Sequence, residues 1–198
     1  NFNVVKELQP KIDKLRETLP SGYRIEVFGE VDISQEVDGL IAETLPFMLV
    51  AILTLLMFEL NSMKKMALVL MTVPLGLIGV VSILLLLDLS FGLVARLGLL
   101  ALVGIIIRNT IILMDQIDQD LAAGSSPWDA VLESTVRRAR PIILTALAAI
   151  FAMIPLVTDY FWGPMAITMM NGLWVATLLT LFVFPTMYVV WFKVDNPQ

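Results

Sequence analysis

The chain contains the stretch MALVLMTVPLGLIGVVSILLLL at residues 66–87, which has no charged side chain. A helix needs roughly 20 apolar residues to cross a hydrocarbon core about 30 Å thick, so the length of this stretch matches a membrane span. Thr72, Pro74 and Ser82 interrupt the apolar pattern. A packed transmembrane helix tolerates such residues because neighbouring groups satisfy its backbone. The stretch therefore predicts a transmembrane helix.

Four further apolar stretches come near this length: Leu40–Leu60, Leu97–Met114, Pro141–Val157 and Met165–Phe192. The last is longer than a bilayer requires, so we expect it to tilt or to project, with Tyr188 and Trp191 at an interface. The expected fold class is an all-α membrane bundle of five transmembrane helices.

The composition excludes several classes of function. Of the 198 residues, 58% are apolar and 16% are charged, against about 45–50% and about 25% in soluble domains. The chain has no His and no Cys, which excludes His-dependent triads, thiol nucleophiles and zinc sites with nitrogen or sulfur ligands. No span carries the two deep aspartates of an intramembrane protease. The net charge of -5 argues against a nucleic-acid partner. We expect no enzyme activity and no cofactor.

Basic residues gather in alternate loops and predict the orientation. They are Lys64 and Lys65, then Arg137, Arg138 and Arg140, and finally Lys193. By the positive-inside rule, these loops are cytoplasmic. Five spans then place the N-terminus outside and the C-terminus, with a tail at residues 194–198, in the cytoplasm.

The first 32 residues have a different pattern. Apolar side chains recur at helical spacing over residues 3–18, and residues 23–28 alternate as a half-buried strand does. One helix and one strand cannot bury a core, so we interpret residues 1–32 as the end of a larger α+β subdomain. Residues 33–193 form the expected transmembrane domain. The chain begins with Asn1 and has no signal-peptide pattern, so we expect it to be the C-terminal part of a longer protein.

Residues 115–140 join the third and fourth spans. We expect the third helix to continue past Asp115 and to stop at Gly124. The sequence Ser-Pro-Trp-Asp at 126–129 has the order of a helix start, with a capping Ser, Pro at the first position and an acid in the first turn. Residues 126–138 therefore predict a short amphipathic helix along the cytoplasmic membrane surface. The alternative is a connecting helix that only fixes the loop.

Arg108 lies inside the third apolar stretch, about 9 Å from its cytoplasmic end. An arginine near a helix centre costs about 2.5–3.5 kcal/mol on insertion scales, so such a residue usually faces a polar interior and has a partner. Glu59, Asp88 and Asp115 lie near the ends of spans. We therefore expect the partner to be a carboxylate on helices absent from this chain. The alternative is a structural arginine that snorkels to the headgroups.

Two polar residues are candidate neighbours of this charge. Thr145 lies one turn into the fourth span from the same side, hence at a similar depth, and Asn109 follows Arg108 directly. An intramembrane charge with hydroxyl and amide neighbours suits a proton relay, because protonation of a paired carboxylate releases the arginine. This chemistry indicates a transporter. A membrane Thr can instead bond to its own backbone.

Small residues mark candidate helix contacts. Gly98, Ala101 and Gly104 share one face of the third span at a spacing that permits close helix approach. We interpret Asn171 and Gly172 of the last span as packing and interhelical hydrogen-bonding residues rather than a ligand site.

Four segments resemble signatures of the resistance-nodulation-division (RND) efflux transporters of Gram-negative bacteria in order and spacing. The segment at 19–29 is similar to the end of the last periplasmic porter subdomain, Val73–Gly79 to the ninth transmembrane helix, Leu97–Leu113 to the tenth, and Arg137–Thr145 to the entry to the eleventh. The resemblance covers essentially the whole chain. It implies that residues 1–32 end the porter subdomain and that the five spans are helices eight to twelve.

The resemblance implies a homotrimeric pump of the bacterial inner membrane that is driven by the proton-motive force. Such a pump expels drugs or other amphiphiles through a periplasmic adaptor and an outer-membrane channel. In the family, a basic residue of the tenth helix pairs with two aspartates of the fourth helix, and a threonine of the eleventh assists. Arg108 and Thr145 match these positions, and Asn109 follows as in the motif. The usual basic residue is Lys. Because Arg holds its proton, the aspartates in the missing N-terminal half are the expected carriers and Arg108 is a fixed countercharge.

Two alternatives stay open from the sequence. One is a membrane assembly piece with no transport of its own, since the expected countercharge is absent from this chain. The other is a protein-export relative with the same helical layout. The sequence does not indicate a substrate, because the residues that contact drugs in the family lie mainly in the periplasmic subdomains.

Overall fold

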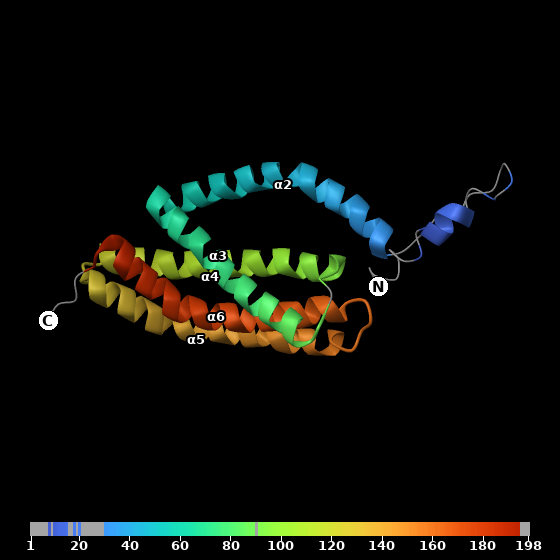
Figure 1. Cartoon of the computed structure of the whole chain (residues 1–198). Helices are drawn as coiled ribbons and strands as arrows, with labels where there is room; N and C mark the ends of the chain where they lie inside the picture. Colours follow the sequence, from blue (N-terminus) through green and yellow to red (C-terminus); the bar gives the residue numbers. More distant parts are fainter. Residues whose placement is uncertain are drawn as a thin grey trace. The chain divides into compact units, whose positions relative to one another are not determined.

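The computed structural model describes residues 8, 10–15, 18, 20, 30–89 and 91–194. In these residues it contains five long helices, one short 3-10 turn and no strand. The elements are α2 (Glu30–Leu60), α3 (Met63–Leu86), α4 (Leu93–Ala122), α5 (Pro127–Met153), η1 (Ile154–Leu156) and α6 (Gly163–Phe192) (Figure 1). Each of the five long helices includes a segment long and apolar enough to cross a membrane. The expectation of five long apolar helices is therefore confirmed.

The chain divides into two compact units, residues 1–51 and residues 52–198. In the first unit, residues 10–15 are helical and α2 begins at Glu30. The strand expected over residues 23–28 and part of the helix expected over residues 3–18 lie outside the described residues. The assignment of residues 1–32 to a periplasmic subdomain stays a prediction.

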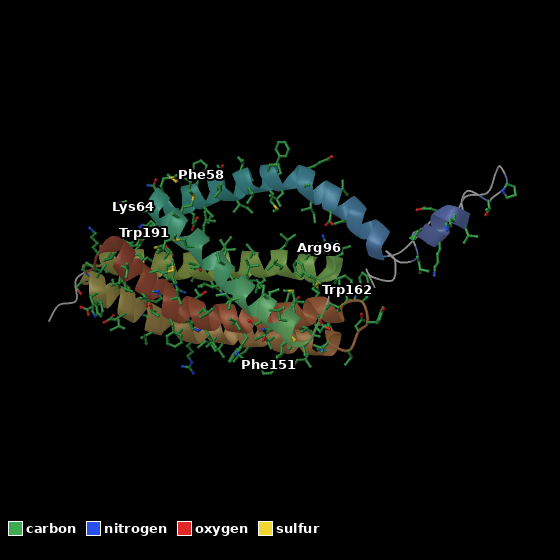
Figure 2. The ribbon with its side chains drawn as sticks, viewed as in Figure 1. Phe58, Lys64, Arg96, Phe151, Trp162 and Trp191 are labelled. Atoms are coloured by element: carbon green, nitrogen blue, oxygen red, sulfur yellow. The ribbon has the colours of Figure 1, made fainter. Side chains whose placement is uncertain are left out.

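The second unit is a bundle in which α6 is the central helix. α6 contacts α3, α4 and α5, and α4 also contacts α3 and α5. Figure 1 shows α5 and α6 side by side along much of their length. Figure 2 shows Lys64 and Trp191 at one end of this unit and Arg96 and Trp162 at the other. We call these the Lys64 end and the Arg96 end.

Two apolar clusters form the core of the second unit. The cluster nearer the Lys64 end contains Leu56, Leu60, Leu68, Val69, Leu113, Met114, Ile117, Val131, Phe184 and Tyr188. The other contains Val80, Leu102, Ile106, Ala146, Leu173 and Ala176. Along α3 and along α4, one fully buried threonine lies between the residues of the two clusters. The hydroxyl oxygens of these threonines, Thr72 and Thr110, are 3.1 Å apart.

Glycines bring α3 and α6 close together. A Cβ on Gly79 would lie 3.0 Å from the Cα of Gly172, so a larger residue would force the two backbones apart. Asn171 donates a hydrogen bond from Nδ2 to the carbonyl oxygen of Gly79. The interpretation of Asn171 and Gly172 as packing and interhelical hydrogen-bonding residues is confirmed.

The third helix continues as expected beyond Asp115. α4 ends at Ala122, and Gly124 follows with a φ of 91°, in the left-handed region that favours glycine. The side chain of Ser126 then accepts a hydrogen bond from the backbone N–H of Asp129, and Pro127 is the first residue of α5. The helix start expected at residues 126–129 is confirmed.

The separate surface helix expected over residues 126–138 is corrected by the structure. α5 is one helix from Pro127 to Met153 with Pro141 inside it. Val131, Ser134, Ile142 and Ala146 are all buried. Residues 131 and 142 are 11 positions apart, close to three helical turns, so the buried residues before and after Pro141 lie on one face of a single helix. Burial of this face favours a continuous helix over a break before the proline.

Candidate functional site

Arg108 lies in the middle of α4 with its side chain exposed. Among the residues that the structure describes, no hydrogen bond or ion pair involves this side chain. An unpaired guanidinium is costly in a membrane, so this arrangement calls for a partner from outside the described part of the chain.

The exposed stripe that carries Arg108 runs along much of α4. It contains Leu97, Ala101, Gly104, Arg108 and Asp115, which follow one another at intervals of three, four or seven residues. This spacing places them on one face of a helix. We call this face the Arg108 stripe. The stripe combines small residues with one charge at mid-helix. The small residues would let a second helix approach the stripe closely.

Asn109 lies about 100° around the axis of α4 from Arg108. Its residue surface is only 7% exposed, and its neighbour Thr110 is fully buried. Thr110 donates to the carbonyl oxygen of Ile106 over 2.9 Å. Within the described residues, Asn109 therefore faces the core of the bundle and Arg108 faces away from it.

Thr145 is exposed on α5. Its hydroxyl donates to the carbonyl oxygen of Ile142 over 2.9 Å, so its own helix satisfies it. The described contacts do not join Thr145 to Arg108. Like Arg108, it presents an exposed polar group.

The three small residues of the third span differ in their surroundings. A Cβ on Gly98 would lie 2.9 Å from Cγ of Met165, so Gly98 is a contact between α4 and α6. A Cβ on Gly104 would meet no atom within 4 Å, and Ala101 is exposed. Within the described chain, Gly98 therefore packs against α6, whereas Gly104 borders open space.

A polar network between α4 and α5 was not anticipated from the sequence. The carboxylate of Asp120 accepts hydrogen bonds from Ser134 over 2.6 Å, Gln116 over 3.2 Å and Arg137 over 3.3 Å. Arg138 in turn donates from Nε to Gln116 over 3.0 Å. The sequence offered one partial signal, the opposite charges of the acidic end of α4 and of the arginines at 137–140, but it did not specify Ser134 as a partner.

A second ionic contact joins α4 to α3. Nζ of Lys65 lies 2.6 Å from one carboxylate oxygen of Asp118 and 2.7 Å from the other. Both side chains are partly exposed, at 23% and 34%. This contact and the Asp120 network lie toward the Lys64 end of the bundle.

A groove between α5 and α6 is apolar. Its volume is about 390 Å³, and it is lined by apolar side chains and two threonines, with no charged residue among them. No group of three His, Cys, Asp or Glu residues within the described ranges could hold a metal ion. What these residues can supply is a positive charge for an acid that comes from elsewhere.

The sequence is similar to those of known efflux and resistance proteins. The sequence matches the AcrB/AcrD/AcrF family over residues 4–192. It is 34% identical over 172 residues to the nickel-cobalt-cadmium resistance protein NccA of Alcaligenes xylosoxydans xylosoxydans, covering 84% of this chain and 16% of NccA. It is 36% identical over 126 residues to the multidrug resistance protein MdtC of Enterobacter sp. (strain 638), covering 61% of this chain and 12% of MdtC.

A solved structure shares the fold. The chain aligns with a crystal structure of a heavy metal efflux pump at a TM-score of 0.74 and 27% sequence identity. The alignment covers 96% of this chain and 19% of that pump. The chain thus spans less than a fifth of the length of these relatives.

Five apolar helices and these relatives fit a multi-pass protein of the inner membrane. The chain belongs to the AcrB/AcrD/AcrF family of RND efflux transporters.

Proposed function

We propose that this chain provides the fixed positive charge of the proton relay in a proton-driven RND exporter. The observation that carries the proposal is the exposed Arg108 at the middle of α4, without a partner in the described residues. A charge in that position is costly in a bilayer, and a group that compensates it lowers this cost. The relatives are transporters rather than enzymes.

The compensating groups are carboxylates on helices outside this chain. We expect them to be a pair of aspartates. Ala101 and Gly104 on the Arg108 stripe leave room for such a helix to approach closely. Protonation of a paired carboxylate removes its attraction to Arg108, and loss of the proton restores it. Because an arginine keeps its proton, the aspartates carry the transported proton and Arg108 stays charged. Thr145 offers an exposed hydroxyl to this pair, whereas Asn109 faces the core of the bundle and adjoins Arg108 only along the chain.

The Lys64 end of the bundle lies in the cytoplasm, and the N-terminus of the chain lies in the periplasm. The excess of Lys and Arg at that end, at the start of α3, in the first half of α5 and in the residue after α6, supports this orientation. The complete transporter is a homotrimer that works with a periplasmic adaptor and an outer-membrane channel. The resemblance to RND pumps supports this assembly.

The exported substrate is a metal cation or a drug. These two classes are supported by relatives named for nickel, cobalt and cadmium resistance and for multidrug resistance. The sequence alone led us to expect only drugs or other amphiphiles. The described residues lack a metal-binding cluster, so substrate choice belongs to other parts of the transporter.

The proposal is tested by proton-driven efflux from cells that express the complete transporter with Arg108→Ala. We expect transport to stop while expression and trimer formation persist. Arg108→Lys should retain substantial transport, because the charge survives although the bidentate geometry does not. Leu85→Ala is the matched control, since it shortens an exposed side chain on a different helix, α3. Normal transport by Arg108→Ala would refute the relay assignment, and no transport by the wild type would favour an assembly piece.

A further inference from the structure

Asp120 is a nearly buried carboxylate at the contact of α4 with α5. Its residue surface is 8% exposed, and Ser134 on α5, which donates to it over 2.6 Å, is fully buried. Hydrogen bonds to an ionised acceptor are shorter and about twice as strong as those between neutral groups. A buried carboxylate that loses its donors is heavily penalised. The Asp120–Ser134 pair therefore favours one arrangement of the two helices.

The surrounding polar groups strengthen this preference. Arg137 reaches Asp120 over 3.3 Å and also Glu133 over 3.0 Å, and the chain from Arg138 through Gln116 ends on the same carboxylate. Asp120 thus accepts from one residue of α4 and from two of α5. A shift of either helix by one turn, about 5.4 Å, would separate these groups.

The apolar contacts between α4 and α5 favour the observed register over a one-turn shift less strongly than the polar contacts do. The hydrophobic attraction between leucine, isoleucine and alanine side chains is non-directional, so it does not by itself specify which residues face each other. Inside a bilayer, lipid tails are as apolar as these side chains. Buried polar groups are known to fix the register of packed helices in other proteins. The register of α4 against α5 therefore depends on Asp120 and Ser134.

The two candidate relay residues lie at matching distances from this pair. Arg108 precedes Asp120 by 12 residues, which is about 18 Å along a helix, and Thr145 follows Ser134 by 11 residues, which is about 17 Å. α4 and α5 are antiparallel neighbours joined by a short loop, so both distances run toward the Arg96 end. The contact at Asp120 and Ser134 thus places Arg108 and Thr145 at the same depth.

We propose that Asp120 and Ser134 are positioning residues of the proton relay: their contact sets the register that holds Arg108 and Thr145 level in the membrane. This inference rests on the proposed function of Arg108. It assigns a role to two residues that neither contact the relay nor lie within two turns of it.

The test compares Asp120→Ala, Ser134→Ala and the exchange Asp120→Ser/Ser134→Asp in the complete transporter. Each single variant should lower the maximal transport rate about tenfold or more, since a misplacement of 1 Å can cost about 10²-fold. The substrate concentration for half-maximal transport should not change. The exchange restores a hydroxyl opposite a carboxylate, so at least half of the wild-type rate should return. Asp118→Ala is the matched control because Asp118 pairs with Lys65 of α3 and should keep the wild-type rate.

Rates are compared at equal amounts of trimer, and Arg108→Ala is measured alongside. Single variants that transport at the wild-type rate, while Arg108→Ala is inactive, would overturn the positioning role and leave the relay intact. Single variants that fail and an exchange that recovers nothing, at equal amounts of trimer, would also overturn it. Normal transport by Arg108→Ala would instead refute the relay itself.

Discussion

Asn171 on α6 donates a hydrogen bond from Nδ2 to the carbonyl oxygen of Gly79 on α3 over 2.6 Å. The bond depends on close approach of the two helices, which Gly79 and Gly172 permit. A Cβ on Gly172 would lie 2.8 Å from Val80 and 2.5 Å from Leu102, so this glycine lies where α3, α4 and α6 meet. In a bilayer, such packing and interhelical hydrogen bonds hold helices together in place of a hydrophobic driving force.

Asn171→Ala should destabilise the bundle because it removes the donor of this bond. Interhelical hydrogen bonds in a membrane contribute about 0.6 kcal/mol on average and at most about 1.7 kcal/mol. We expect a decrease of this size in the free energy of unfolding of the purified transporter in mixed micelles, measured by titration with a denaturing detergent. An unchanged unfolding midpoint would show that the bond contributes nothing to stability.

Gly79→Ala should have a larger effect. The added methyl group would lie 2.8 Å from Cβ of Val175 and 3.0 Å from backbone atoms of α6, which cannot rotate away. Overpacking of this kind costs about 1–3 kcal/mol. Gly39→Ala on α2 is the control, because a Cβ there would meet no atom within 4 Å. In the same titration, the free energy of unfolding of the Gly39→Ala variant should equal or exceed that of the wild type, since Ala stabilises a helix by up to about 1 kcal/mol over Gly.

The long helices could be predicted from sequence, but their ends could not. The apolar stretch at 97–114 located the centre of α4, yet the helix extends from Leu93 to Ala122. Its last turns include Asp118 and Asp120, which contact Lys65 and Ser134 of neighbouring helices. Hydropathy marks only the part of a helix that suits lipid, whereas the polar turns are held by contacts that depend on the neighbours.

The same distinction applies to the candidate site. Arg108 could be identified because a single charge inside an apolar helix is conspicuous without any knowledge of packing. The pairing of Asp120 with Ser134 could not, since it depends on the rotation and register of two helices. The continuity of α5 through Pro141 was missed for a related reason, because the buried face that favours it becomes evident only when α5 packs against its neighbours.

Ser126→Ala should destabilise the start of α5. The hydroxyl oxygen of Ser126 accepts the backbone N–H of Asp129 over 3.2 Å, which satisfies one of the free donors of the first turn. Loss of such a cap costs about 0.5–2 kcal/mol, whereas replacement by Gly costs only a few tenths. Unfolding of the purified variants should therefore rank the wild type first, Ser126→Gly close behind and Ser126→Ala last. An Ala variant as stable as the wild type would contradict the capping role.

Gly104 tests whether another helix covers the Arg108 stripe. A Cβ at this position meets no atom within 4 Å in the described chain, so the bundle itself would accept a larger side chain. If a helix with the relay carboxylates packs there, a larger side chain would push it away from Arg108. A displacement of about 1 Å can reduce the rate of a coupled step by up to about 10²-fold.

Transport by the complete pump should therefore fall in steps with the size of the side chain at this position. Gly104→Ala should retain most of the proton-driven efflux rate, and Gly104→Leu should lose at least about nine-tenths of it, in keeping with that sensitivity to displacement. Rates are compared at equal amounts of trimer, so that a loss of transport is separated from a loss of assembly. Full efflux by Gly104→Leu would indicate that lipid rather than a helix covers this part of the stripe, and the carboxylate partner of Arg108 would then have to approach from another side.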